Sequence, residues 1–413
     1  MFQHGGRKQQ KRRPFIIWLG LTIFTVYIMI TIYAAYKLIN TTETRQADGK
    51  FIEKELRENV DIPKQPSQYR EVTEVERLPP AIPEVEVWGK AAIGLYFWEH
   101  IMEGTSEKVN DELWTYGVKV VDNVRFKFRT GPWVVPQTVP VTSQYVVLII
   151  NGRILKKIEF AKMWLNSLNS LQNLKKIAII LLGNEQCNND WLLPYMERNG
   201  GLVNMAYIVY DIPNQDDTTL QWPLGVATYR NFPRISMSEK EISETRAYSC
   251  NFLGTVYKGS SRETLQDIFN KHKLYSICYL RIRETWQPSE NKETANEYYQ
   301  ALLQSDLTLC PVGINTECYR IYEACSYGSV PVVEDVQTKG NCSKTPLQLL
   351  KYYNAPFIYV KSWNELPQIL QKEKQLSPLE KVRRRKKLLK WYQEFKMKLK
   401  QSFVAKLKRT FFS

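Results

Sequence analysis

Two charged residues in the last third of the chain, Arg320 and Glu323, have the types and spacing needed to bind a nucleotide. They lie three positions apart in residues 317–324, which have helical periodicity, so they share one helical face. An apolar strand pattern at residues 305–311 precedes them, which places the pair at the carboxyl end of a strand, where ligands bind in α/β sheets. Arginine can fork onto a phosphate, and a carboxylate can accept two ribose hydroxyls. The alternative is an exposed ion pair.

A second candidate phosphate site is the loop at residues 254–260. It connects a predicted strand to a helix that begins with the capping pattern Ser-Ser-Arg-Glu at residues 260–263. Backbone N–H groups at a helix start attract anions, and Gly254, Lys258 and Arg262 would lie around a diphosphate bound there. The ordinary alternative is a capped surface helix without a ligand.

Three residues in the first half of the chain are candidates for a general base. Glu99 and His100 directly follow a predicted strand at residues 91–97, and Glu185 follows another at residues 177–182. Loops after parallel strands face the ligand-binding edge of a sheet. Glu99 is the first choice, because its aromatic neighbours would raise its pKa towards a useful value. The alternative for Glu99 is an ordinary acid in the first turn of a helix.

Several other chemistries have no support in the sequence. There is no G-x-G-x-x-G motif, and the loop at residues 254–261 lacks the lysine of a nucleoside-triphosphatase. No Asp-x-Asp pair occurs, and beyond residue 38 the only histidines are His100 and His272, without ligand spacing. No G-x-S-x-G is present, which excludes the usual serine hydrolase. We therefore expect phosphate charge to be met by arginines and a helix start, with no metal site.

The elements that must position these residues form two alternating α/β halves. Short β-rich apolar runs alternate with helical patterns, which predicts parallel sheets joined by right-handed crossovers. Strands are predicted at residues 91–97, 145–150, 177–182, 205–210, 249–253, 276–280, 307–310, 330–333 and 357–360. Helices are predicted at residues 155–174, 262–272, 293–304, 318–327 and 346–352, and residues 221–244 read as the linker. The predicted fold is two doubly wound domains that face each other across a cleft.

The chain has 57 Lys and Arg against 42 Asp and Glu, but the excess lies at its two ends. Residues 1–13 hold five basic residues and no acid, residues 376–413 hold 13 basic residues and two acids, and the remainder is balanced at 39 against 40. A generally basic nucleic-acid-binding protein is therefore excluded. Residues 14–36 carry no charge, and the 22 of them at residues 15–36 would make a helix of roughly 33 Å, enough to cross a bilayer. The basic flank before this span predicts a cytoplasmic N-terminus and a luminal remainder.

The chain therefore divides into a membrane anchor, a spacer and a folded part. The spacer is rich in proline and charge and lacks apolar periodicity. At the C-terminus, residues 377–409 have an apolar helical stripe among basic residues, which predicts a packed helix with a solvated basic face. The predicted order is cytoplasmic tail 1–13, signal anchor 14–38, luminal stalk 39–84, a first Rossmann-like domain 85–235, a second Rossmann-like domain 236–376 and basic helix 377–413.

Seven cysteines, all beyond the stalk, suit an oxidising compartment. The number is odd, so at least one thiol is free or pairs with another chain, and the pairing cannot be deduced from sequence. Two sequons for N-glycosylation begin at Asn40 and Asn341. The first adjoins the membrane anchor, so Asn341 is the better candidate for a glycosylated surface position.

Three segments of the second half resemble a known family. The segments "SDLTLCPVG" and "RIYEACSYGSVPVV" resemble the nucleotide-sugar-binding region of exostosin-type GT-B glycosyltransferases, and "RAYSCNFLGTVYKGSSR" resembles the strand and loop before it. From "VWGKAAIGLYFWEHIMEG" to its end, the chain is similar to a family of vertebrate Golgi transferases that add xylose to ribitol 5-phosphate. One departure is Tyr319-Arg320, where exostosin segments often carry two arginines.

The resemblance implies a type II Golgi membrane enzyme with two Rossmann-like domains of GT-B type. Residues 85–235 would be the acceptor domain, which supplies the base, and residues 236–376 the nucleotide-sugar domain. It would transfer xylose from UDP-xylose, with inversion, in a β1,4 linkage to ribitol 5-phosphate on the O-mannosyl glycan of α-dystroglycan. It implies other dystroglycan-modifying Golgi enzymes as partners and no essential metal. Two alternatives stay open: an exostosin-like transferase of glucuronate or N-acetylglucosamine to a proteoglycan-type acceptor, and a non-catalytic luminal binder of phosphorylated glycans.

Overall fold

The computed structural model describes residues 82–109, 113–213, 215–287 and 289–412. The predicted cytoplasmic tail, the signal anchor at residues 14–38 and nearly all of the stalk lie outside these residues. Among the helices in the described ranges, none is both long enough and apolar enough to cross a membrane.

The first sheet has eight strands in the order β2-β3-β4-β1-β5-β6-β7-β8. Their bounds are Glu84–Gly89 (β1), Glu107–Val109 (β2), Trp114–Val121 (β3), Val124–Thr130 (β4), Tyr145–Asn151 (β5), Lys176–Leu182 (β6), Met205–Val209 (β7) and Thr219–Trp222 (β8). From β4 to β8 all neighbouring pairs are parallel, whereas β2, β3 and β4 pair antiparallel. The structure confirms the predicted strands at residues 145–150, 177–182 and 205–210. Helix α3 (Leu155–Ser167) and the short helix η2 (Leu168–Ser170) follow β5.

The predicted strand at residues 91–97 is wrong. β1 ends at Gly89, and the chain then forms helix α2 (Ile93–Leu95) and a π-helical turn, η1 (Tyr96–Ile101). A short apolar run with aromatic residues does not distinguish a buried strand from a buried helix. Gly94 allows this helix to approach the sheet, because a Cβ there would lie 3.2 Å from Gly89 Cα. Glu99 and His100 therefore lie in a helical turn and not in a loop after a strand.

The second sheet has five strands in the order β10-β9-β11-β12-β13, and every pair is parallel. The strands are β9 (Tyr248–Thr255), β10 (Cys278–Arg283), β11 (Ser305–Cys310), β12 (Val330–Glu334) and β13 (Ile358–Val360). The helices are α5 (Ser261–His272), α6 (Lys292–Leu303), α7 (Tyr319–Ser326), α8 (Gln348–Tyr352) and α9 (Leu366–Gln375). All of these confirm predicted elements except α9, which the sequence patterns did not indicate. The linker contains η5 (Thr228–Arg230) and α4 (Glu239–Ser243).

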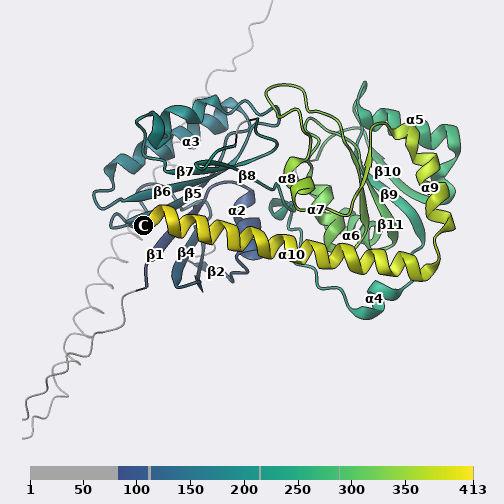
Figure 1. Ribbon diagram of the computed structural model, residues 1–413, viewed down its shortest axis with the longest axis horizontal. Coiled ribbons are helices and arrows are strands. Elements are labelled where there is room, and N and C mark those ends of the chain that lie inside the picture. Colours follow the sequence, from purple (N-terminus) through teal and green to yellow (C-terminus); the bar gives the residue numbers. More distant parts are fainter. Residues whose placement is uncertain (1–81, 110–112, 214, 288, 413) are drawn as a thin grey trace, which may run out of the picture. The chain divides into compact units, whose positions relative to one another are not determined.

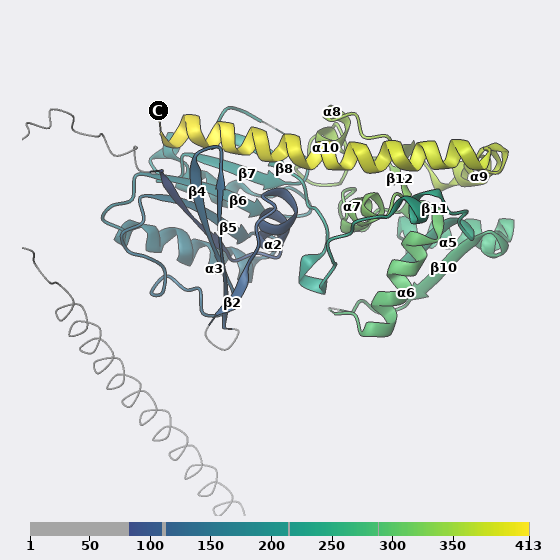
Figure 2. The same cartoon turned by 90° about the horizontal axis from the view of Figure 1, so that it is seen from below.

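Helix α10 (Pro378–Phe411) runs past both sheets and confirms the predicted C-terminal helix (Figures 1 and 2). Near its start, Trp391 packs on Phe357 of the second half at 5.1 Å between ring centroids. Further along, Phe403 packs on Phe97 of the first half at 5.1 Å. The apolar stripe of the helix thus contributes to the cores of both halves.

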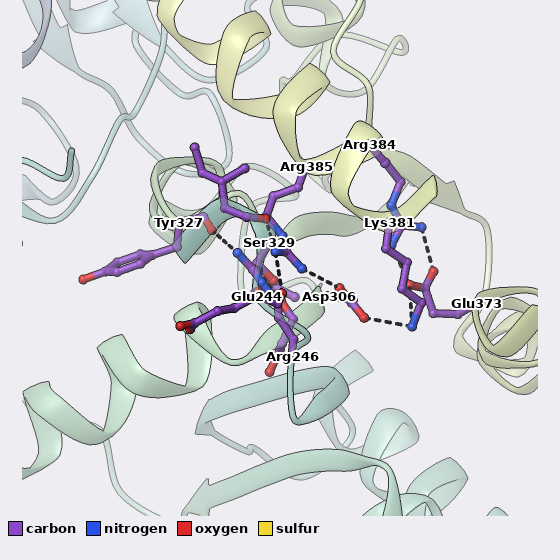
Figure 3. Close-up of polar contacts among 12 residues, drawn as sticks. Glu244, Arg246, Asp306, Tyr327, Ser329, Glu373, Lys381, Arg384 and Arg385 are labelled. Carbon is purple, nitrogen blue, oxygen red and sulfur yellow. Dashed lines mark hydrogen bonds and ion pairs between the residues drawn. The ribbon is translucent and has the colours of Figure 1, made fainter. Parts of the chain in front are cut away.

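The basic face of α10 was expected to be solvated, but some of its basic side chains form ion pairs with buried carboxylates. Asp306 at the start of β11 is 5% exposed, and it accepts hydrogen bonds from Arg385 at 3.1 Å and from Lys381 at 2.9 Å. Figure 3 shows Asp306 between these two side chains, with Glu373 bonded to Lys381 and Arg384 beside it. These contacts tie the start of α10 to the second sheet.

Two disulfides occur among the described cysteines. Cys250–Cys278 joins the neighbouring strands β9 and β10. Cys187–Cys342 joins the loop after β6 in the first half to the loop after β12 in the second half, over a sequence separation of 155 residues. The remaining three, Cys310, Cys318 and Cys325, are free thiols.

Candidate active site

Arg320 lies in the first turn of α7, beyond the carboxyl end of β11, as predicted. Its Nη2 donates a hydrogen bond to the carbonyl of Leu253 at 2.7 Å, and its guanidinium lies 4.9 Å from the ring centroid of Phe252. Gly254 makes this approach possible, because a Cβ there would be 2.9 Å from Arg320 Nη2. The arginine is therefore held against the carboxyl end of β9.

A second guanidinium, that of Arg262, lies close to the first. Its Nη1 donates to the carbonyl of Thr255 at 2.8 Å, and Gly313 faces its Nη2, 2.9 Å from where a Cβ would be. Burial lowers the pKa of Arg262, and the positive charge of Arg320 lowers it further. The Nε atom of each arginine is buried without a hydrogen-bond partner. Two mutually repelling cations with unused donors form an arrangement that an anion would stabilise.

Glu323, one turn further along α7, is buried with 5% exposure. Its carboxylate accepts hydrogen bonds from the Ala227 backbone N–H at 3.1 Å and from the Tyr298 hydroxyl at 2.5 Å. Burial raises the pKa of Glu323. Arg320 and Glu323 thus have separate partners among the described residues and do not form the exposed ion pair considered above.

The start of α5 has the contacts of an ordinary capped helix, which was the alternative to a phosphate site at this loop. Ser260 accepts from the Glu263 N–H at 3.3 Å, and the Glu263 carboxylate accepts from the Gly259 N–H at 2.6 Å. Glu334 accepts from the hydroxyl of Ser261 near the same helix start. Lys258 is exposed in the preceding loop. Two carboxylates therefore already meet this helix start. Of the residues predicted there, Arg262 belongs to the arginine pair and Gly254 lies beside it, whereas Lys258 makes no contact with the pair that the structure records.

Glu185, the third base candidate, lies in the loop after β6. Its Oε2 forms an ion pair with Nη2 of Arg153 at 2.7 Å, and Arg153 comes from the loop after β5. The amide of Asn315, from the loop after β11, donates to the Glu185 carbonyl at 2.7 Å. The charge of Glu185 also acts on the pKa of Arg262, in opposition to burial. The loop that carries Glu185 thus meets the second half of the protein beside the arginine pair.

Two tyrosines complete this region. Tyr210 follows β7, is 1% exposed, and has a φ of +80°, a strained conformation for a bulky residue. Burial raises the pKa of Tyr210, while the charge of Arg153 opposes this rise. Tyr319, the first residue of α7, has a buried hydroxyl without a partner. Sequence reasoning missed Tyr210, Tyr319, Arg153 and Asn315. For Arg153 a signal existed, because it follows a predicted strand at its carboxyl end.

Glu99 and His100 lie in a different environment. Burial raises the pKa of Glu99, and the charge of Arg234 opposes this effect. Burial lowers the pKa of His100 to about 4, with Lys396 and Arg234 adding to the effect, and its Nε2 is buried without a partner. The charged neighbours of this pair are thus Arg234 and Lys396 of α10 rather than the arginine pair. Among the described residues, no group of three potential metal-ligating side chains gathers.

Two α/β halves on largely parallel sheets, with paired arginines at the carboxyl edge of one and a carboxylate at the edge of the other, form the arrangement expected of a glycosyltransferase. Among solved structures, the catalytic domain of starch synthase IV from Arabidopsis thaliana, bound to ADP and acarbose, aligns with a TM-score of 0.39 and 8% identity, over 80% of this chain and 99% of that chain. This similarity is too distant to support further inference.

Sequence comparison identifies the family. The family model described as RXYLT1 N-terminal domain matches residues 85–223, and the family model described as RXYLT1 C-terminal domain matches residues 229–412. The chain is 52% identical over 338 residues to ribitol-5-phosphate xylosyltransferase 1 of Homo sapiens, covering 79% of this chain and 76% of that protein. It is 43% identical over 429 residues to the Danio rerio protein of the same name, covering 98% of each. The chain therefore belongs to the ribitol-5-phosphate xylosyltransferase family.

Proposed function

We propose that this protein transfers xylose from UDP-xylose to ribitol 5-phosphate, in a β1,4 linkage with inversion, on the O-mannosyl glycan of α-dystroglycan. The names of relatives at 43–52% identity support the sugar and the acceptor. The observation that carries the chemistry is the pair Arg262 and Arg320 at the carboxyl edge of the second sheet. Burial and the charge of Arg320 both lower the pKa of Arg262, and each arginine has an Nε without a hydrogen-bond partner. A departing nucleoside diphosphate has the charge and geometry that this pair would bind.

In this proposal the donor binds to the second half. Arg262 and Arg320 hold the diphosphate and stabilise the charge that develops as it leaves, so no metal is essential. Glu323 accepts the ribose hydroxyls, while the Ala227 N–H and the Tyr298 hydroxyl each orient one of its carboxylate oxygens. Gly254 keeps the surface beside Arg320 free of a side chain.

The base in this proposal is Glu185. Arg153 holds its Oε2, which leaves Oε1 to accept the proton of the ribitol hydroxyl. The deprotonating oxygen attacks the anomeric carbon while the bond from that carbon to the UDP oxygen breaks on the opposite face. Glu185 is favoured over Glu99 and His100 because its loop adjoins the arginine pair through Asn315, whereas the other two adjoin Arg234 and Lys396.

We place the enzyme in the Golgi membrane as a single-pass type II protein with a luminal catalytic part. The uncharged residues 14–36, the basic residues before them and the disulfide Cys187–Cys342 support this location. Other dystroglycan-modifying Golgi enzymes are the proposed partners.

The test uses a secreted protein that lacks residues 1–38. It is supplied with UDP-xylose, UDP-glucuronate or UDP-N-acetylglucosamine, and with a ribitol-phosphate or a proteoglycan-type acceptor. We expect turnover only with UDP-xylose and the ribitol-phosphate acceptor, and a β-xyloside by NMR. Preference for another donor would favour the exostosin-like alternative, and UDP binding without turnover of any pair would favour a non-catalytic binder.

A further inference from the structure

An arginine and two exposed aromatic rings meet at the carboxyl edge of the second sheet. The Arg230 guanidinium lies over the ring of Trp286, 5.5 Å from its centroid, and is 5.6 Å from the ring centroid of Tyr229. Trp286 follows β10 and is 55% exposed, and Tyr229 is 43% exposed. We call the Trp286 ring with Arg230 over it the tryptophan platform. Ligand sites are lined mainly by hydrophobic and aromatic side chains, so this platform is a candidate subsite.

Hydrogen bonds hold Arg230 in this position. Its Nη1 forms an ion pair with Oε1 of Glu290 at 3.2 Å, and its Nη2 donates to the carbonyl of Gln287 at 2.5 Å. Arg283, the last residue of β10, donates to both carboxylate oxygens of Glu290, at 2.8 and 2.6 Å. These bonds fix the segment that carries Trp286 to β10 and to the linker. Since Arg230 covers one face of the indole, a ligand would stack on the opposite face of a ring that is already positioned.

The platform lies along the sheet edge that carries the proposed donor site. β10, β9 and β11 are neighbouring parallel strands, and the segments that follow them carry Trp286, Arg262 and Arg320 respectively. Burial raises the pKa of Glu323, and the charge of Arg230 is among the effects that oppose this rise. Arg230 is therefore within electrostatic reach of the carboxylate proposed to bind the ribose. With the diphosphate at the two other arginines and the ribose at Glu323, the part of the donor left to be placed at this edge is its base.

We propose that the open face of Trp286 stacks on the uracil ring of the donor. This inference rests on the proposed function, which assigns UDP-xylose to the second half. A nucleobase is flat, and stacking brings its π face against that of an aromatic side chain. The xylose is attached to the far end of the diphosphate, where it must reach Glu185, so it is not the part of the donor that meets the platform. Trp286 is thus a binding residue, and Arg230, which holds the indole in place, is a positioning residue.

The test compares UDP with inorganic pyrophosphate, which has the diphosphate charge but no base. Calorimetry measures the Kd of each ligand for the full-length protein in detergent. We expect Trp286→Ala to raise the Kd for UDP by about 5- to 150-fold, the range for the loss of one stacked base, with an unchanged Kd for pyrophosphate. Trp286→Phe keeps an aromatic face and should retain most of the affinity. Trp133→Ala is the matched control, because Trp133 is 52% exposed but belongs to the first half. An unchanged Kd for UDP in Trp286→Ala, equal losses for the two ligands, or the same loss in Trp133→Ala would overturn the proposal.

Further arms separate the possible failures. A wild-type protein that binds UDP but transfers no xylose contradicts the proposed function alone, and the Trp286→Ala titrations still decide the platform. A raised KM for the acceptor in Trp286→Ala, with a normal Kd for UDP, would mean that the acceptor glycan meets Trp286 and would overturn the proposal. Arg230→Gln should weaken UDP without weakening pyrophosphate, and Arg230→Lys, which keeps the cation, should recover part of the affinity. An equal loss for pyrophosphate in Arg230→Gln would contradict its positioning role.

Discussion

Replacement of Glu185 by glutamine should slow xylose transfer without disturbing the fold. The Glu185 Oε2 accepts from Arg153 Nη2 at 2.7 Å, and the amide oxygen of glutamine can accept the same hydrogen bond. With that oxygen held by Arg153, the amide nitrogen takes the position of Oε1. A hydrogen-bond donor would then face the ribitol hydroxyl, where the mechanism needs a proton acceptor. The substitution therefore removes basicity and little else.

The size of the effect follows from the role of a general base. Loss of such a group lowers kcat by about 10² to 10⁴, which corresponds to roughly 3 to 5 kcal/mol of transition-state stabilisation at about 1.36 kcal/mol per tenfold. Affinity for UDP should stay nearly unchanged, because Arg262 and Arg320 are intact. Glu99→Gln is the matched control, since it makes the same chemical change in a half-buried carboxylate whose charged neighbour is Arg234.

The assay measures initial rates with saturating UDP-xylose and ribitol 5-phosphate, together with UDP affinity by calorimetry. We expect a large loss of kcat in Glu185→Gln and near-normal kcat in Glu99→Gln. A near-normal kcat in Glu185→Gln would refute the reasoning from the position of its loop. A large loss in Glu99→Gln alone would return the base to Glu99, and His100→Asn tests the third candidate in the same way.

Four other outcomes are expected. Arg320→Ala should weaken diphosphate binding, and Glu323→Ala should weaken ribose binding. Each loss should be about 1.5 to 3 kcal/mol per charged hydrogen bond removed, and KM for UDP-xylose and kcat measure it. Activity should survive EDTA, and a complete loss that added metal reverses would contradict a metal-free mechanism. Arg385→Ala should lower the free energy of unfolding by about 3 kcal/mol in urea titrations, because it leaves Asp306 buried with fewer partners. An unchanged midpoint would mean that the Arg385–Asp306 ion pair contributes nothing to stability. Burial lowers the pKa of His100 from its ordinary value of 6.5 to about 4. Between these two pH values the unfolded chain binds a proton that the folded protein does not. The free energy of unfolding should therefore fall as pH falls from about 6.5 to 4. His100→Gln should flatten that loss in thermal melts across this range.

The strands of the parallel sheets were predictable because a strand buried on both faces has a nearly continuous run of apolar residues. Strands such as β5 and β6 are nearly continuous apolar runs, and the structure has them at the expected positions. The hairpin of β3 and β4 was missed, although Asp122 and Asn123 between these strands both have positive φ, as a two-residue hairpin turn requires. The strands flanking that turn have exposed faces with charged residues, which weakened the apolar pattern.

The residues of the candidate site also divide into those that the sequence predicts and those that only the tertiary structure identifies. Arg320 and Glu323 could be found from sequence, because one helix turn brings them together and their spacing is local. The contacts of Glu185 could not be found, because Arg153 and Asn315 reach it from loops after two other strands, one of them in the other sheet. Only the tertiary fold brings these three together.

Helix α10 has a consequence for the order of events during synthesis. Phe403 and Phe411 near the C-terminus pack on Phe97 and Tyr145, which are among the first folded residues to be made. An apolar face of the first half therefore stays uncovered on the ribosome until nearly the whole chain has been translated. During that interval the nascent first half would need a chaperone to cover this face. A chain cut short by its last dozen residues would leave the first half incomplete, although every residue of both sheets would be present.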